Sequence, residues 1–155
     1  MLVAIDNPGG FDQVPYHIPD TVLETCLRRL AEAKGVKPTA APRRMNRGEA
    51  IKTAKTETAR YVVWLQVRNE RADYGADVST QSNQLYVTFI IYEPVSAKIK
   101  ESGRADYRTA KVGNVGVSGP SRGAVYADYA IKEPPRLAAD RILNAFQIKI
   151  DGWPR

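Results

Sequence analysis

Residues 59–68 read ARYVVWLQVR and residues 84–93 read QLYVTFIIYE, and both are predicted to form long strands. Both are rich in β-branched and aromatic residues, which favour strands. In the first stretch Val63 and Leu65 lie on one face, and the apolar Trp64 lies on the other. A strand that is apolar on both faces needs cover on both sides, so we expect it near the centre of a sheet that carries helices.

Three helices are expected around these strands. Apolar residues recur at helical spacing from residue 20 to 34, and they include Val22 and Cys26. Asn46 and Glu49 have the spacing of a capping box, which predicts a second helix over 47–56. The pair Pro134-Pro135 is suited to a helix start, so the third helix is expected over 135–146.

The remaining strands complete the fold prediction. Strands are expected at 2–5, at 36–42 on a sheet edge because of its two prolines, and at 124–131. Strand character continues from 84 to 100, and a turn at Ser102-Gly103 leads into a strand at 104–112. The chain of 155 residues is therefore expected to form one α+β domain over 1–155. Its mixed sheet should have about five or six strands packed by two to three helices.

Composition excludes several classes of protein. One cysteine and one histidine leave no disulfide framework and no cysteine or histidine metal cage. No run of about 18 apolar residues is present, so no transmembrane segment is expected. No nucleophile, base and orienting group can be assembled. The sequence therefore predicts a non-enzymatic protein with no catalytic residues, no metal and no cofactor.

Positive charge gathers between residues 28 and 60. This segment holds ten Lys and Arg residues against three Glu residues, within a chain whose net charge is +6. A surface for an anionic partner is one interpretation, and a solvated helical face is the other. The candidate residues for that surface are Arg43, Arg44, Arg47, Lys52 and Lys55.

Two polar insertions, 69–83 and 112–123, are not needed by the expected core. The glycines of the second lack the Lys-Ser or Lys-Thr pair of a phosphate loop, and they do not open a helix. A partner-binding loop is the functional interpretation, with Gly113, Gly116, Gly119 and Arg122 as its candidate residues. Tyr86, Tyr92, Tyr126 and Tyr129 could present a stacking surface, but ordinary strand packing is the favoured interpretation of these tyrosines.

Several stretches of the chain resemble a known family. They are the opening VAI, the passage AKGVKPTAAP, the segment EAIKTAKTETARYVVWLQV with Ala59 to Val63, the segment LYVTFIIYEPVSAKIKESG, and the closing LAADRILNAF with Ala138 to Ile142. Together they resemble the N-terminal domain of TolB. They are also similar to the envelope lipoproteins of curli secretion and of penicillin-binding-protein activation.

This resemblance implies a periplasmic or cell-envelope protein-interaction module that belongs to an assembly or secretion system. From the two insertions and the expected sheet edges, we expect the partner, another protein or a second copy of the chain, to bind through a strand edge next to residues 36–42 or through the insertions. Tethering near a membrane and a periplasmic location would require a leader in the full-length protein, and the chain would otherwise be cytoplasmic. The alternative is a nucleic-acid-binding module that uses the basic 28–60 segment.

Overall fold

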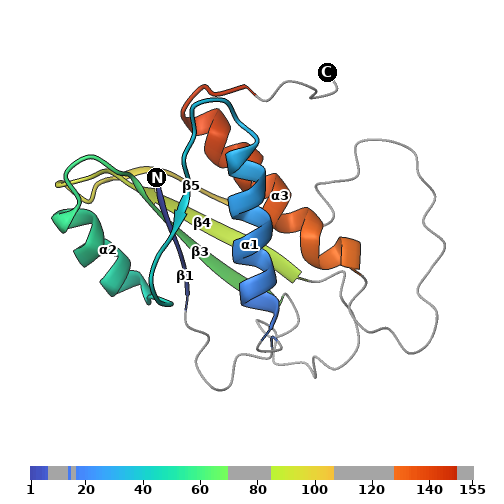
Figure 1. The fold of residues 1–155 in the computed structure, drawn as a ribbon. Coiled ribbons are helices and arrows are strands. Elements are labelled where there is room, and N and C mark those ends of the chain that lie inside the picture. Colours follow the sequence, from blue (N-terminus) through green and yellow to red (C-terminus); the bar gives the residue numbers. More distant parts are fainter. Residues whose placement is uncertain (7–13, 15–16, 70–84, 107–127, 150–155) are drawn as a thin grey trace.

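Five strands and three helices make up the described part of the chain (Figure 1). The computed structural model describes residues 1–6, 14, 17–69, 85–106 and 128–149. In chain order the elements are β1 (Leu2–Ile5), α1 (Ile18–Ala31), β2 (Thr39–Ala40), α2 (Arg47–Thr56), β3 (Val62–Asn69), β4 (Leu85–Tyr92), β5 (Ile99–Asp106) and α3 (Asp128–Ala145).

The strands form one mixed sheet in the order β2-β1-β3-β4-β5. The pairs β1–β2 and β1–β3 are parallel, whereas β3–β4 and β4–β5 are antiparallel. The apolar strand β3 is therefore central, as its sequence predicts, and the Pro-flanked β2 lies at an edge. The α+β fold class with a mixed sheet of five strands and three helices is confirmed.

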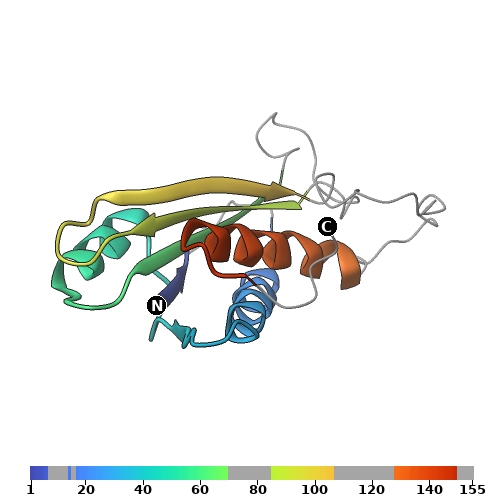
Figure 2. The ribbon, with the colours of Figure 1, turned by 90° about the horizontal axis from the view of Figure 1, so that it is seen from above.

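The larger core lies between the sheet and the helices α1 and α3, which lie side by side on one face (Figure 2). Alternate strand residues such as Val63, Leu65 and Phe89 point into it, and all three are nearly fully buried. The helices contribute Cys26 from α1 and Ile142 from α3. The core-facing residues of α1 and α3 are therefore the apolar ones that recur at helical spacing in the sequence.

A smaller core lies on the opposite face, under α2. It contains Val62, Trp64 and Tyr92 from the sheet and the small residues Ala50 and Ala54 from the helix. The Trp64 indole Nε1 donates a hydrogen bond of 2.8 Å to the carbonyl oxygen of Met45. The other face of β3 is therefore covered as well, but by one short helix.

A buried polar contact joins α1 to α3. The Arg29 Nε donates to Asp140 Oδ1 at 2.8 Å, and the side chains of both residues are largely buried. Cys26 lies nearby and is fully buried. Burial raises the pKa of the Cys26 thiol to about 12, and the negative charge of Asp140 acts in the same direction. The expectation of a buried Cys26 on the apolar stripe of this helix is confirmed.

The position of the β4–β5 turn differs from the prediction. Strand character was expected to run on to residue 100, with a turn at Ser102-Gly103, but β4 ends at Tyr92 and Gly103 lies inside β5. The turn spans 94–96, where Val95 adopts a positive φ of 64°. The Val95 N–H donates to the carbonyl oxygens of Ala54 and Glu57. The end of α2 thus fixes a turn that strand propensity alone does not show.

The predictions for the last two elements were also wrong in part. Residues 124–131 were expected as a strand, but α3 begins at Asp128, and the proline pair lies inside it. Ile131, Pro134, Pro135 and Ala138 are all buried, so the apolar stripe of the helix extends back beyond the prolines. Packing of this stripe outweighs the missing amide donors. The residues expected at 107–112 and 124–127 lie outside the described part of the chain.

Among the described residues, none of the three helices could serve as a transmembrane segment.

The buried thiol leads to a first prediction. Because Cys26 is enclosed and its pKa is raised, iodoacetamide at pH 8 should leave it unmodified in the native protein and alkylate it after unfolding in guanidinium. Cys26→Ser should lower the free energy of unfolding by about 1–3 kcal/mol, because it buries a poorly paired hydroxyl. Rapid alkylation of the native protein, followed by mass spectrometry, would contradict this placement.

A second prediction concerns Gly103, which pairs with Phe89 across β4 and β5. A Cβ at Gly103 would lie 2.8 Å from two carbons of the buried Phe89 ring. Gly103→Ala should therefore lower the free energy of unfolding by about 1–3 kcal/mol in chemical denaturation. The neighbouring exposed Ser102→Ala is the matched control and should change it by less than about 0.5 kcal/mol. Equal stability of Gly103→Ala and the control would show that the ring moves freely.

Candidate functional site: a groove on the sheet

The face of the sheet that carries α2 is only partly covered. Along β3, the side chains on this face change from the apolar Val62 and Trp64 to the polar Gln66 and Arg68. The same change occurs on β4, where Thr88 lies two residues before Ile90. Because α2 is a helix of 10 residues that packs near Val62 and Trp64, the polar part of the face lies beyond it.

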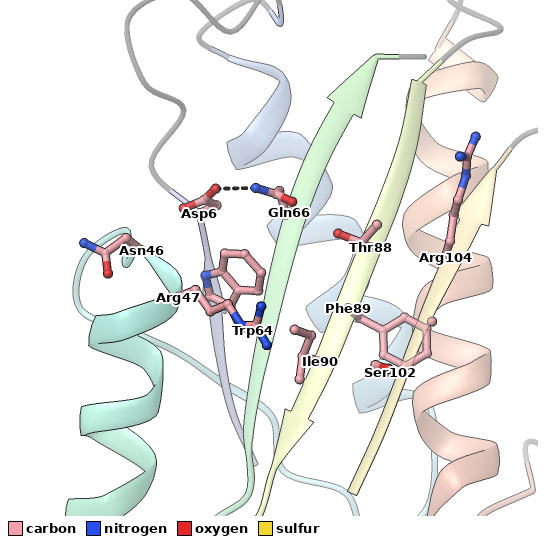
Figure 3. A pocket seen from close by; sticks show the side chains of 11 residues that line it. Asp6, Asn46, Arg47, Trp64, Gln66, Thr88, Phe89, Ile90, Ser102 and Arg104 are labelled. Atoms are coloured by element: carbon pink, nitrogen blue, oxygen red, sulfur yellow. Dashed lines mark hydrogen bonds between the residues drawn. The ribbon is translucent and has the colours of Figure 1, made fainter. Parts of the chain in front are cut away.

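The uncovered part forms an open hollow of about 720 Å³, which we call the sheet groove (Figure 3). Its wall is the start of α2, and its floor is formed by the end of β1 with β3, β4 and β5. The lining residues are Asp6, Asn46, Arg47, Trp64, Gln66, Thr88, Phe89, Ile90, Ser102, Gly103 and Arg104.

Strand register places four polar side chains of the groove in one row across the sheet. Gln66 pairs with Thr88, and Thr88 pairs with Arg104. Asp6 follows the pair of Ile5 with Leu65, and its Oδ2 accepts a hydrogen bond of 2.8 Å from Gln66 Nε2. Figure 3 shows the row from Asp6 to Arg104. The groove therefore carries a carboxylate, an amide, a hydroxyl and a guanidinium at the spacing of adjacent strands.

Arg104 is held at one end of this row. Its guanidinium carbon lies 3.8 Å from the centroid of the Tyr86 ring, which is a cation–π contact. The Arg104 Nε also lies 3.5 Å from Asp106 Oδ2, and the Arg104 carbonyl accepts a hydrogen bond from the Arg141 side chain. The tyrosine ring and the carboxylate thus fix the plane of the guanidinium.

Arg47 supplies a second guanidinium from the wall of the groove. It is the first residue of α2, and its Nε donates to the Tyr92 hydroxyl at 3.3 Å. The preceding Asn46 and the following Glu49 form a reciprocal capping box. The hydrogen bonds that Glu49 accepts from the Asn46 N–H and from Arg43 lower the pKa of its carboxyl group. The start of α2, and with it Arg47, is therefore held by several hydrogen bonds.

The five basic residues singled out in the sequence have different environments. Arg43 is ion-paired with Glu49 at 2.7 Å, and Arg44 reaches Asp20 of α1 at 2.8 Å. Lys52 and Lys55 are exposed on α2. Arg47 alone of the five lines the sheet groove.

The wider basic segment does not gather on one surface. Its first residues, Arg28 and Arg29, belong to α1, and α1 packs on the sheet face opposite α2. Arg60 is paired with Glu57 at 2.6 Å. The positive charge of residues 28–60 is thus divided between the two faces of the sheet.

The structure describes only some of the residues of the other surfaces that the sequence predicts. Gly113, Gly116, Gly119 and Arg122 lie outside the described residues, as do residues 70–84 of the first insertion. Tyr86 is 5% exposed and Tyr92 is 1% exposed, so neither ring offers an open face for stacking. Tyr126 and the side chain of Tyr129 lie outside the described residues. Within the described ranges, no group of three His, Cys, Asp or Glu residues could hold a metal ion.

The groove itself was not predicted from the sequence. Its signal was present in the alternation of the two central strands, where Gln66 follows Trp64 on one face and Thr88 precedes Ile90. Polar residues at these positions indicate a face that is not buried along its whole length. The row of Gln66, Thr88 and Arg104 depends on strand register, and the wrongly predicted β4–β5 turn gave no correct register for Arg104.

The chain has the same fold as solved structures of another protein. No protein-family model matches the chain, and no curated protein matches it. Among solved structures, the dodecamer of PelC from Paraburkholderia phytofirmans and the dodecamer of a variant of that PelC with one leucine replaced by methionine each match with a TM-score of 0.52 at 16% sequence identity. Each match covers 96% of this chain, and they cover 86% and 88% of the respective PelC chains. The chain therefore shares its fold with these PelC chains.

A third prediction tests how the wall of the groove is held. Asn46→Ala removes the side chain that caps α2, and it should lower the free energy of unfolding by about 0.5–2 kcal/mol in urea denaturation. Asn144→Ala is the matched control, because Asn144 is exposed in the last turn of α3 and its side chain caps no helix start. A smaller loss for Asn46→Ala than for the control would exclude the capping role.

Proposed function

We propose that this protein is a non-enzymatic protein-interaction module of the cell envelope that works by self-association. The observation that carries the proposal is the match of 96% of the chain to PelC chains whose solved form is a dodecamer. The envelope part of the proposal is supported by the resemblance of the sequence to the N-terminal domain of TolB. The fold likeness at 16% identity supports an assembling subunit without fixing its partners.

The edge strand β5 is the surface that favours self-association. Within the described residues it pairs only with β4, so its outer backbone groups face away from the sheet. Most of its residues are exposed. Such an edge strand is a template for a strand of another chain, although the Arg104 carbonyl already accepts a hydrogen bond from Arg141.

The opposite edge is less suited to pairing. We expected a partner next to residues 36–42, but β2 has only two residues. Pro38 and Pro42 lie one residue before and two residues after it, and neither carries an amide donor. We therefore place the self-association surface at β5.

Apolar side chains lie next to the same edge. Among the described residues, the exposed large apolar side chains are Val95, at 62%, and Ile99, at 51%. Val95 is in the turn that leads into β5, and Ile99 is the first residue of the strand. Burial of these side chains by a second copy would add to the backbone pairing.

Nucleic acid is the less supported partner. Arg29, Arg43, Arg44 and Arg60 each pair with a carboxylate, and the basic segment is divided between two faces. The buried Tyr86 offers no open stacking face.

The fourth prediction tests self-association by light scattering coupled to size exclusion. The protein should elute with a mass several times the 17.2 kDa of one chain, and Ile99→Asp should reduce that mass to the monomer value. We expect this loss of mass because the carboxylate at residue 99 would be buried in the interface without a partner. Asn144→Asp introduces the same charge on α3 and is the matched control. A monomeric wild-type protein at high concentration would refute the proposal.

A further inference from the structure

The sheet groove holds two guanidinium groups that approach from different elements, Arg47 from the start of α2 and Arg104 from β5. We infer that this groove binds an acidic, extended segment of a partner polypeptide. The inference rests on the proposed function, because it takes the partner to be a protein. It adds a ligand class and a binding site that is separate from the β5 edge.

The chemistry of the groove favours carboxylates. A guanidinium presents five N–H donors in a plane, a geometry that matches both oxygens of a carboxylate. Arg104 uses its ring-facing side for Tyr86 and its Nε for Asp106, and Arg47 uses its Nε for Tyr92. These contacts orient both groups before a ligand binds. The net charge of +6 adds a general attraction for acidic chains.

The acid already in the groove does not oppose this assignment. Asp6 lies at the far end of the polar row from Arg104, and its Oδ2 accepts the Gln66 amide. Between the two ends lie the Gln66 amide and the Thr88 hydroxyl, and the Ser102 hydroxyl lies two residues from Arg104 on β5. Neutral donors and acceptors of this kind suit the peptide groups of a bound chain.

The spacing of the groove suits an extended peptide. Thr88 and Ile90 are alternate residues of β4 on the groove face, and they are therefore about 6.6–6.8 Å apart. Arg104 pairs with Thr88, whereas Arg47 reaches Tyr92 beyond Ile90. Alternate side chains of an extended peptide repeat at the same interval. A peptide with an acidic residue at every second position can therefore present carboxylates to both arginines.

A saccharide or a nucleic acid base is less suitable as the occupant. Both are commonly held against an open aromatic face. Trp64 and Tyr86 are each 5% exposed, and the Arg104 guanidinium stacks on the Tyr86 ring. The described part of the groove therefore supplies hydrogen bonds and charge but no stacking platform.

The fifth prediction is tested by fluorescence anisotropy at low salt. The probe is a fluorescein-labelled peptide of alternating glutamate and threonine, and its control is the same peptide with glutamine in place of glutamate. The glutamate peptide should bind saturably, and the glutamine peptide should bind at least tenfold more weakly. Equal affinity for both peptides would overturn the inference.

Variants then locate the binding site. Arg47→Gln and Arg104→Gln should each weaken binding of the glutamate peptide at least fivefold. Arg136→Gln is the matched control and should bind as the wild type does, because Arg136 is on α3, on the other side of the sheet, and is paired with Glu133. Arg104→Lys keeps the charge without the planar donor set, and it should fall between the wild type and Arg104→Gln. Unchanged binding by a folded double variant, Arg47→Gln with Arg104→Gln, would overturn the site.

Two further experiments distinguish a peptide ligand from other ligands, and peptide binding from self-association. A carboxylate-bearing oligosaccharide such as an oligogalacturonate, or an oligothymidylate, should compete weakly with the glutamate peptide. Stronger competition by either one would overturn the peptide assignment. Light scattering on the same samples distinguishes the two proposals, because the Arg47→Gln, Arg104→Gln variant should retain the wild-type mass. An assembled protein that binds no acidic peptide would overturn only the groove, whereas a monomer that binds the peptide would overturn only self-association.

Discussion

Strand β3 is buried on both faces by apolar side chains, and each face needs its own cover. Val63 and Leu65 require the layer of α1 and α3, and Val62 and Trp64 require a second cover on the opposite face. The helix α2 supplies that cover with small residues, which let it approach the sheet closely. The Trp64 indole also bonds to the chain just before α2. One strand thus determines why helices lie on both sides of the sheet.

The short second cover also determines where the groove lies. With 10 residues, α2 covers Val62 and Trp64 but does not extend over Gln66 and Thr88. A longer apolar helix would need apolar residues at these positions, and the chain carries polar ones instead. The polar row and the length of α2 are therefore consistent with each other. The open face is a property of the sequence as well as of the packing.

Most of the fold could be predicted because local patterns and tertiary packing agree over β1, α1, α2 and β3. The predictions failed where contacts between distant segments decide the structure. The turn before β5 depends on Val95 binding the end of α2, and the start of α3 depends on Ile131 packing into the core. The same limit applied to the site. Arg47 was singled out by charge, but Arg104, on the opposite side of the groove, enters it only through the β4–β5 register.

Strand β5 connects the two proposed surfaces. Its outer edge is the proposed site of self-association, and its Arg104 is one end of the groove. Arg104 is also joined to α3 through its carbonyl group, which accepts from Arg141, so this part of β5 is held from the side of the larger core. A strand added at the edge would therefore meet a backbone that is already positioned. The groove side chains point out of the plane of the sheet, whereas strand pairing uses the in-plane backbone groups, so both surfaces of β5 can be occupied at once.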